Sequence, residues 1–318
     1  TLLMLNELRF VQGSVARKDF KPELVHFHIK GGRIQGYNGM FSLCCPIALD
    51  LDITPNAVQL IKAVQGCSDT IAMSVTPAGR LAIKSGRYKA FVDCFPGGFP
   101  EILPEGERVQ LAEPILPAIK MLAPCVAEDA SRQWARGILF RGRSMYATNN
   151  VVLVERFFDT TFPCEMNLPL EAANELLRVG EEPTHLLVAK DTVTFFFEGE
   201  RWLRAQLYTS TWPDMAKVLD RPSAPLPPPL CLEDLTGLLP FLDDGGRVHF
   251  LAGGIATSAT DGEGASTAVP GLPAGGIYNA HMLRLALERA AAIDFTQYPA
   301  PCLFVGDRLR GALIGMRP

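Results

Sequence analysis

Long hydrophobic runs are missing from this sequence. No stretch of 18 or more apolar residues occurs, so we expect no membrane-spanning helix. Residues 1–9 lack the basic start, apolar middle and small-residue cleavage site of a secretory signal peptide. The eight cysteines include no Cys-x-x-Cys pair, which favours buried, reduced thiols over a metal site or a disulfide framework. We therefore expect a cytoplasmic protein, with the adjacent Cys44 and Cys45 facing opposite sides of a strand.

Catalytic motifs are also missing. The chain has no Gly-x-Ser-x-Gly elbow, no P-loop, no His-Glu-x-x-His and no Gly-x-Gly-x-x-Gly after a strand. Its five histidines do not cluster at ligand spacing, and His26 and His28 share one strand face, which is more typical of a solvated face than of a metal site. We expect no enzyme, no cofactor and no metal, with an enzyme kept as a rival class.

No large excess of one charge is present. The formal net charge is −4, which argues against a basic coat over the whole surface but allows one basic face on an acidic body. Basic residues outnumber acidic ones by 12 to 10 in residues 1–112, whereas acidic residues prevail by 15 to 12 in 113–222 and by 9 to 6 in 223–318. A 48% apolar and 20% charged composition is typical of ordinary folded cores.

A repeated unit is what the sequence does contain. Residues 137–154 read as three strands separated by turns at 141–143 and 149–150, and apolar spacing predicts a helix before them, within 114–126. Five more units of one helix followed by strands are predicted. Their helices cover 4–15, 57–64, 170–178, 232–242 and 281–290, and their strands cover 24–29, 34–37, 41–45, 70–76, 80–84, 87–94, 185–189, 192–197, 202–207, 248–251, 254–258, 302–305 and 308–317.

Two segments interrupt this pattern. The proline-rich residues 222–229 predict a stiff connector, and the Gly/Ser/Ala/Pro stretch 261–276 predicts a mobile loop. Six units in 318 residues pair naturally into three domains, 1–112, 113–222 and 223–318. The expected class is α+β, with two helices packed against the sheets of each domain.

Four strings, in order, resemble one family. They are Gly137-Ile-Leu-Phe with Tyr146-Ala-Thr-Asn-Asn-Val-Val-Leu-Val, the segment 207–219 with its Trp-Pro-Asp turn, Tyr278-Asn-Ala-His-Met-Leu, and the terminal Met316-Arg317. In order and spacing they are similar to strings of the bacterial DNA polymerase III β subunit, the sliding clamp. The chain departs from that family by being shorter, by Asn149-Asn150 in place of Asp-Gly, by Val152 in place of Arg, and by Gly315 in place of Pro. These departures favour a divergent member and leave open a phage origin.

The resemblance implies a processivity factor. Two chains would close head to tail into a homodimeric ring around duplex DNA, without base readout, and would tether the polymerase and the clamp loader through short linear peptides. Each cation could equally be a solvated surface charge. The DNA-contacting residues that the resemblance and the helix positions suggest are Arg9, Arg17, Lys18, Lys21, Lys62, Lys120, Arg132, Gln133, Trp134, Arg178, Arg284 and Arg289.

The resemblance also implies a partner-peptide pocket between the second and third domains, and a ring interface. The pocket would use Arg132, Trp134, Thr148, Asn150, Leu153, Leu219, Asn279, Met282, Ala312, Ile314, Met316 and Arg317, although Leu153, Ile314 and Met316 could be ordinary core residues. The interface would use Arg87, Ala90, Val92, Leu238, Phe241 and Leu242. The alternative is a clamp-like protein-binding scaffold that does not encircle DNA.

Overall fold

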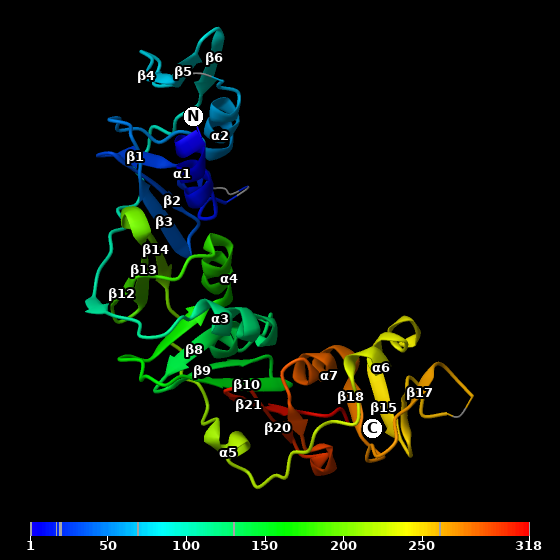
Figure 1. Cartoon of the computed structure of the whole chain (residues 1–318). Coiled ribbons are helices and arrows are strands. Elements are labelled where there is room, and N and C mark those ends of the chain that lie inside the picture. The colour runs from blue at the N-terminus through cyan, green and yellow to red at the C-terminus, as the bar shows by residue number, and fades with distance from the viewer. Residues whose placement is uncertain are drawn as a thin grey trace. The chain divides into compact units, whose positions relative to one another are not determined.

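The computed structural model describes residues 2–16, 18, 21–68, 70–129, 131–260 and 262–317, which form two compact units (Figure 1). Unit 1 comprises Thr1–Leu116 and Glu171–Leu207, and unit 2 comprises Pro117–Leu170 and Tyr208–Pro318. Both units contain helices and antiparallel sheets, which confirms the predicted α+β class. Because the predicted middle domain contributes residues to both units, the three-domain division stays a prediction.

Unit 1 is built on a seven-stranded sheet in the order β1-β2-β3-β14-β13-β12-β7, and a second sheet has the order β4-β5-β6. Every neighbouring pair of strands is antiparallel. The strands are β1 (His28–Lys30), β2 (Arg33–Tyr37), β3 (Phe41–Pro46), β4 (Ala72–Val75), β5 (Leu81–Ser85), β6 (Tyr88–Val92), β7 (Glu107–Val109), β12 (His185–Val188), β13 (Thr192–Phe197) and β14 (Arg201–Gln206).

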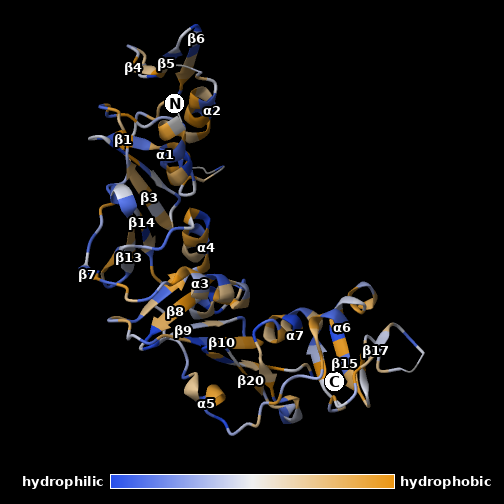
Figure 2. Cartoon of the chain, in the orientation of Figure 1, coloured by the Kyte–Doolittle hydropathy of each residue, from blue (hydrophilic) through white to orange (hydrophobic). Residues whose placement is uncertain are grey.

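Three helices belong to unit 1: α1 (Leu2–Gln12), α2 (Ala57–Gln65) and α4 (Leu170–Val179). Apolar residues at helical spacing bury one side of each, and Figure 2 shows hydrophilic and hydrophobic residues together on α4. Arg178 joins α4 to α1, because its guanidinium donates to the carbonyl oxygen of Phe10 at 2.6 Å and to the carboxylate of Glu175 at 2.8 Å. Asn56 begins α2 by accepting from the Gln59 amide at 3.1 Å.

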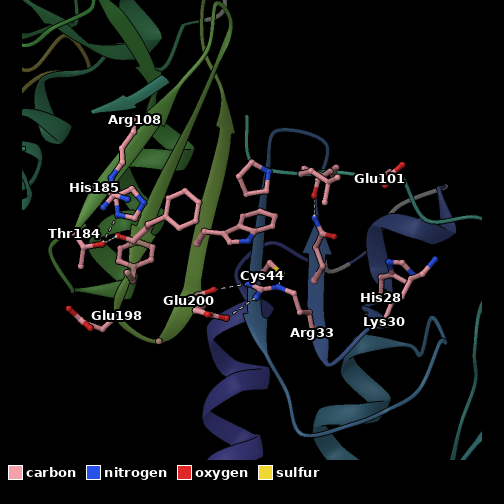
Figure 3. A pocket seen from close by; sticks show the side chains of 18 of the residues that line it. His28, Lys30, Arg33, Cys44, Glu101, Arg108, Thr184, His185, Glu198 and Glu200 are labelled. Carbon is pink, nitrogen blue, oxygen red and sulfur yellow. Dashed lines mark hydrogen bonds and ion pairs between the residues drawn. The ribbon is translucent and has the colours of Figure 1, made fainter. Parts of the chain in front are cut away.

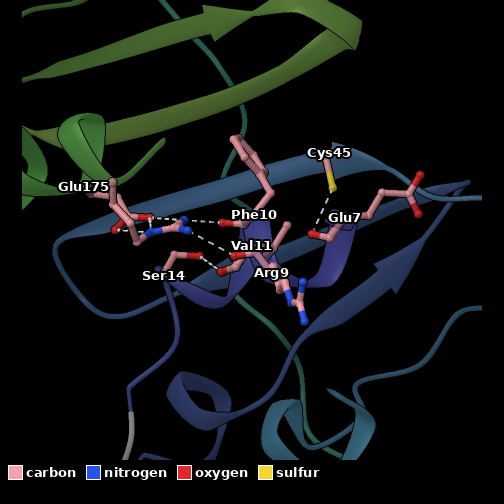
Figure 4. Close-up of polar contacts among 8 residues, drawn as sticks. Glu7, Arg9, Phe10, Val11, Ser14, Cys45 and Glu175 are labelled. Carbon is pink, nitrogen blue, oxygen red and sulfur yellow. Dashed lines mark hydrogen bonds and ion pairs between the residues drawn. The ribbon is translucent and has the colours of Figure 1, made fainter. Parts of the chain in front are cut away.

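Cys44 and Cys45 confirm that β3 has two differently covered faces. The Cys45 thiol donates to the carbonyl oxygen of Glu7 on α1 at 3.6 Å (Figure 4), so this side of the sheet carries the helix. Cys44 instead packs with Ile102 and Trp202 on the opposite face. Both cysteines are buried, and neither forms a disulfide. Burial raises the pKa of each thiol, which favours the protonated form over the thiolate.

Unit 2 repeats this plan with a seven-stranded sheet, β11-β8-β9-β10-β21-β20-β19, and a four-stranded sheet, β17-β16-β15-β18. Its helices are α3 (Leu116–Leu122), α5 (Ala216–Leu219), α6 (Leu232–Thr236) and α7 (Ala280–Leu287). Its strands are β8 (Gly137–Arg141), β9 (Ser144–Thr148), β10 (Val152–Phe157), β11 (Met166–Pro169), β15 (Arg247–Leu251), β16 (Gly254–Ala256), β17 (Ser266–Ala268), β18 (Ile277–Asn279), β19 (Ala292–Ile293), β20 (Cys302–Gly306) and β21 (Leu309–Leu313).

Six three-stranded meanders of the structure follow one pairing rule: β1–β3, β4–β6, β8–β10, β12–β14, β15–β17 and β19–β21. In each seven-stranded sheet the third strands of two meanders pair antiparallel, β3 with β14 and β10 with β21. The other third strands, β6 and β17, lie at the edges of their sheets, each with one strand neighbour among the described residues. The repeat predicted from turn spacing is therefore also a repeat of strand pairing.

Several local predictions are wrong. The predicted strand 24–29 begins as a 3₁₀ helix, Pro22–Val25, because proline suits a first turn, and only His28 onward is a strand. The predicted helix 232–242 breaks at Gly237 into α6 and the 3₁₀ helix Leu239–Phe241. The predicted loop 261–276 contains β17, and the last strand ends at Leu313. The strands β7, β11, β18 and β19 and the helix α5 are additional to the prediction, as are the 3₁₀ helices Ala123–Cys125, Gln133–Arg136, Glu198–Glu200 and Phe295–Gln297.

The core of each unit lies between its helices and its sheets. Leu8 and Val11 of α1 are fully buried in unit 1, as are Phe140 and Phe304 of the large sheet in unit 2. Each such side chain contributes about 1.5–3 kcal/mol by leaving water. Among the described residues, no helix is long and apolar enough to cross a membrane.

Candidate functional site

An apolar cluster lies at the β10–β21 junction of unit 2, where the sequence placed part of the peptide pocket. Leu153 stands opposite Ala312, and Ala312 stands opposite Leu303, so the three form a row across β10, β21 and β20. Leu219 of α5 packs onto this row, together with Tyr146, Met215 and Val218. The structure thus brings together Leu153, Leu219 and Ala312, three of the residues predicted for the pocket, and α5 is the element that positions Leu219. All three are buried, so their role in a pocket stays a prediction.

A buried carboxylate adjoins this cluster. Glu155 is 3% exposed, and it accepts from Ser144 Oγ at 2.7 Å, Tyr146 Oη at 2.6 Å and Arg310 Nε at 2.6 Å. Arg310 also donates to Asp220 at 2.7 Å. Burial, with the Glu155 carboxylate beside it, raises the pKa of Tyr146 to about 12. The sequence prediction omitted these residues, and the one available signal was the charged pair Glu155-Arg156 directly after an apolar run.

A turn next to the cluster holds the predicted polar residues. Asn150 has a φ of +71°, and Arg132 Nη1 donates to its side-chain oxygen at 2.9 Å. The Asn150 amide donates to Thr148 Oγ1 at 3.0 Å, so the two predicted residues fix the same turn. Trp134 packs edge to face on Trp212, with ring centroids 5.1 Å apart. The predicted rim residues Arg132 and Trp134 therefore lie at the start of the 3₁₀ helix Gln133–Arg136, and each is held by its own side-chain contact.

The C-terminal segment and α7 hold the remaining residues predicted for the peptide pocket. The Ile314 amide donates to Val151 at 2.8 Å, the Met316 amide donates to Ile277 at 2.7 Å, and Arg317 is exposed. Ile314 is 42% exposed, whereas Met316 is half-buried, so Ile314 is not an ordinary core residue.

On α7, Met282 lies beside the turn of β10. Its sulfur accepts from Asn149 Nδ2 at 3.1 Å. Asn279 caps α7 by accepting from the amides of His281 and Met282, which gives its side chain a structural role beside any in a pocket.

The residues proposed for DNA contact differ in their exposure and in their ion pairs. Arg9 on α1, Lys62 on α2 and Lys120 on α3 are exposed, as are Lys18, Lys21, Arg132 and Gln133. Arg178 and Arg284 are also exposed, but they form ion pairs with Glu175 and Glu288. Arg17 lies outside the described residues.

Arg289 is the exception and requires a correction. Its side chain is 7% exposed, and its guanidinium donates to the carbonyl oxygens of Met121 and Leu285. A phosphate could reach it only by displacing these bonds. We therefore remove Arg289 from the candidate DNA contacts.

The residues predicted for the ring interface divide into two groups. Phe91, beside the predicted Ala90, is 46% exposed on β6 with Lys89 Nζ 5.0 Å from its ring centre, and Phe241 is 59% exposed. Arg87 is exposed, and Ala90 and Leu242 are half-buried. Val92 and Leu238 are each 1% exposed, so they belong to the cores of their own units rather than to a free surface.

Within the part of the chain that the structure describes, no group of three or more His, Cys, Asp or Glu side chains is placed to hold a metal ion. The candidate site is therefore described by apolar packing, hydrogen bonds and ion pairs alone.

Comparison with known proteins identifies the fold. No family model and no curated protein matches the sequence. Solved structures match along the whole chain. A DNA polymerase III β subunit of Caulobacter crescentus has a TM-score of 0.83 at 18% identity, covering 99% of this chain and 98% of its own.

Two further structures agree. A putative DNA polymerase III β subunit of Eubacterium rectale has a TM-score of 0.82 at 11% identity, covering 99% and 97% of the two chains. A Helicobacter pylori β clamp bound to a DNA ligase peptide has a TM-score of 0.76 at 16% identity, covering 99% and 98%. The chain has the fold of these sliding clamps, as the sequence strings predicted.

Proposed function

We propose that this chain is a non-catalytic DNA sliding clamp of the cytoplasm. Two copies close head to tail into a ring around duplex DNA, and short peptides of a polymerase and a clamp loader bind at the β10–β21 junction. The whole-length likeness to sliding clamps supports the fold on which this proposal rests. The single observation that carries the ring is that two third strands, β6 and β17, each have one edge without a strand neighbour among the described residues.

By the same pairing rule, the free edges of β6 and β17 are expected to pair with each other between two copies. Third strands join antiparallel at β3–β14 and at β10–β21, which leaves β6 and β17 as the third strands at sheet edges. An exposed strand edge presents unpaired amides and carbonyls, which natural proteins cover. If β6 of one copy pairs with β17 of the other, the contact is head to tail, and two such contacts close a ring of two chains.

The exposed cations on the helices fit a lining for duplex DNA. Arg9, Lys62 and Lys120 are exposed on three different helices, and Arg284, exposed but paired with Glu288, lies on a fourth. A few separated charges give weak, salt-dependent contacts with phosphates, which permit sliding without base recognition.

The β10–β21 junction fits a short peptide with a large apolar anchor. The partly buried Tyr146, Met215 and Val218, which pack on the buried Leu153, Leu219 and Ala312, offer apolar surface. Polar groups on Asn150 and Arg132 and the exposed Ile314 lie on the same unit. One of the similar structures is a clamp bound to a DNA ligase peptide, which supports this class of partner.

The ring is tested by mass and by topology. Light scattering over a dilution series should give a particle of twice the 34.7 kDa chain mass. The protein, loaded on nicked circular DNA, should remain bound after gel filtration and should leave once the circle is cut. A monomer at all concentrations that still binds clamp-binding peptides would support the scaffold alternative instead.

A further inference from the structure

A second groove, in unit 1, lies on the face of the large sheet that α1 does not cover (Figure 3). Its cavity volume is about 1120 Å³, at the upper end of what small-molecule pockets occupy. The segment 99–104 forms one wall, where Phe99 stacks on His28 with ring centroids 5.0 Å apart. The carbonyl oxygen of Ile102 accepts from Gln35 at 2.9 Å, so this wall is fixed to the sheet.

Strand register makes the floor of this groove continuous. Directly opposed residues run across six strands from β1 to β12, so their side chains share one face of the sheet. The row is His28, Gln35, Cys44, Trp202, Phe196 and His185. Six strands at about 4.8 Å spacing give a row roughly 24 Å long, the length of about seven extended residues.

The middle of the row is apolar. Cys44, Trp202 and Ile102 form one buried cluster, and the half-buried Phe196 packs against it. His185 stacks flat on Phe196, with ring centroids 4.5 Å apart and planes 8° from parallel. This arrangement, at the β3–β14 junction, parallels the cluster at the β10–β21 junction of unit 2.

Charges lie along the groove, and one cation is free. Lys30 pairs with Asp52 at 3.7 Å, and Arg33 pairs with Glu200 at 3.6 Å. Arg108, on β7 near His185 (Figure 3), has no ion-pair partner among the described residues. It is exposed, so an anionic group of a bound molecule can reach it.

We propose that this groove binds an extended peptide of about seven residues from a partner protein, with a large apolar side chain on the Phe196–Trp202 surface and a carboxylate on Arg108. The inference goes beyond the proposed function, because the peptide site of that proposal lies in unit 2. The inference does not depend on ring formation, because the groove lies within unit 1 of a single chain.

Three glutamates in the groove favour a peptide over nucleic acid. Glu101, Glu198 and Glu200 line it, matching in number the cations Lys30, Arg33 and Arg108. A phosphate chain carries one negative charge per nucleotide and meets repulsion from these carboxylates. A peptide with a single acidic residue can place that one charge on Arg108 and leave the rest of its length uncharged beside the glutamates.

The test uses the full chain and a defined probe. The probe is a fluorescein-labelled nonapeptide of Gly and Ser with a central Leu-Phe anchor and one flanking Asp. Control probes replace Leu-Phe by Ala-Ala, or Asp by Lys, and a third control is a 12-nucleotide oligo-dT. A diazirine-bearing Leu in the anchor then marks the binding surface for mass spectrometry of the digested protein.

Two variants are compared with wild type. Arg108→Glu removes the free cation from the groove, and Lys190→Glu makes the same charge change at an exposed turn of unit 1 outside the groove lining. Both are measured in an Ile314→Asp background as well, which impairs the unit 2 surface. Circular dichroism verifies that each variant is folded.

The expected result is cross-linking within residues 99–104 or 196–202, with binding weakened about 10-fold or more by Arg108→Glu but not by Lys190→Glu. Cross-linking within the groove should be unchanged in the Ile314→Asp background, because Ile314 lies in unit 2. Cross-links only in unit 2, equal effects of the two charge reversals, absence of binding at millimolar probe, or preference for oligo-dT would each overturn the inference. Retention on circular DNA, measured on the same variants, reports the ring separately.

Discussion

Glu155 and Arg310 stand directly opposite each other on β10 and β21, and Arg310 Nε donates to the Glu155 carboxylate at 2.6 Å. The carboxylate is almost completely buried and also accepts from Ser144 and Tyr146. A buried charge is tolerated only when it is paired and hydrogen-bonded. This pair therefore holds the junction that carries the candidate peptide site of unit 2.

Arg310→Met should destabilise the protein by about 2–3 kcal/mol, because it leaves the Glu155 carboxylate buried without its cation while keeping most of the side-chain stem. This loss is smaller than that expected for a fully buried ion pair, because the Arg310 side chain is 32% exposed. Urea denaturation, followed by far-ultraviolet circular dichroism, measures the change. Lys217→Met, at an exposed residue of α5, is the control, and an equal loss in both variants would contradict the role given to the pair.

Asp294 gives a prediction about acid stability. Burial raises the pKa of its carboxyl group, but donors on Thr296, Ala224 and Ser223 outweigh burial and hold that pKa below its usual value. A depressed pKa contributes stability that is present above the unfolded-state value, about 3.9, and is lost as pH falls through the lower folded-state value. Asp294→Asn should therefore cost about 1–2 kcal/mol at pH 7, and the difference from wild type should shrink below pH 4.

Urea denaturation of both proteins between pH 3 and pH 7 measures this trend. Asp307→Asn, at an exposed turn, should show no such pH-dependent gap. A difference between wild type and Asp294→Asn that stays constant over the whole range would show that the carboxylate is not the stabilising form.

Asn150 gives a prediction that separates backbone strain from side-chain contacts. Its φ of +71° lies in the left-handed region, which Asn and Gly tolerate and Ala does not. Asn150→Ala should cost about 1–2 kcal/mol, whereas Asn150→Gly should change stability much less. Both variants release Arg132 from its 2.9 Å bond, so both should weaken peptide binding at the unit 2 surface to a similar degree. Thermal denaturation and fluorescence anisotropy would distinguish the two effects, and equal stability of the Ala and Gly variants would refute the strain argument.

The sequence predicted what depends on local patterns. Asn38-Gly39 and Arg141-Gly142-Arg143 mark turns between strands whose existence the structure confirms, and apolar spacing located α2 and α4 within one or two residues. Short elements were missed, because three residues such as Glu107–Val109 carry no periodicity, and β7 forms through pairing with β12. Gly237 also ended a helix that apolar spacing alone extended to residue 242.

The sites depended on contacts that spacing does not reveal. The strings around Thr148 and Met316 indicated the unit 2 surface through resemblance, and the structure places them on neighbouring turns and strands. The Glu155–Arg310 pair and the His28–His185 row could not be predicted, since both arise from the register of strands far apart in the sequence. Similarly, Arg289 and Leu238 looked available in sequence but are buried by tertiary packing.

Two exposed side chains on one small sheet provide the sharpest prediction about assembly. Phe91 lies on the edge strand β6 and is 46% exposed, and Val75 lies on the opposite edge strand β4 and is 45% exposed. If β6 forms the ring contact, Phe91→Glu removes its apolar side chain and buries a charge there, and it should raise the dimer dissociation constant about 100-fold, whereas Val75→Glu should leave it unchanged. Sedimentation equilibrium measures the constant for each variant, and retention on circular DNA should fall only for Phe91→Glu. If both variants, or neither, shift the dimer to monomer, β6 is not the strand through which two copies join.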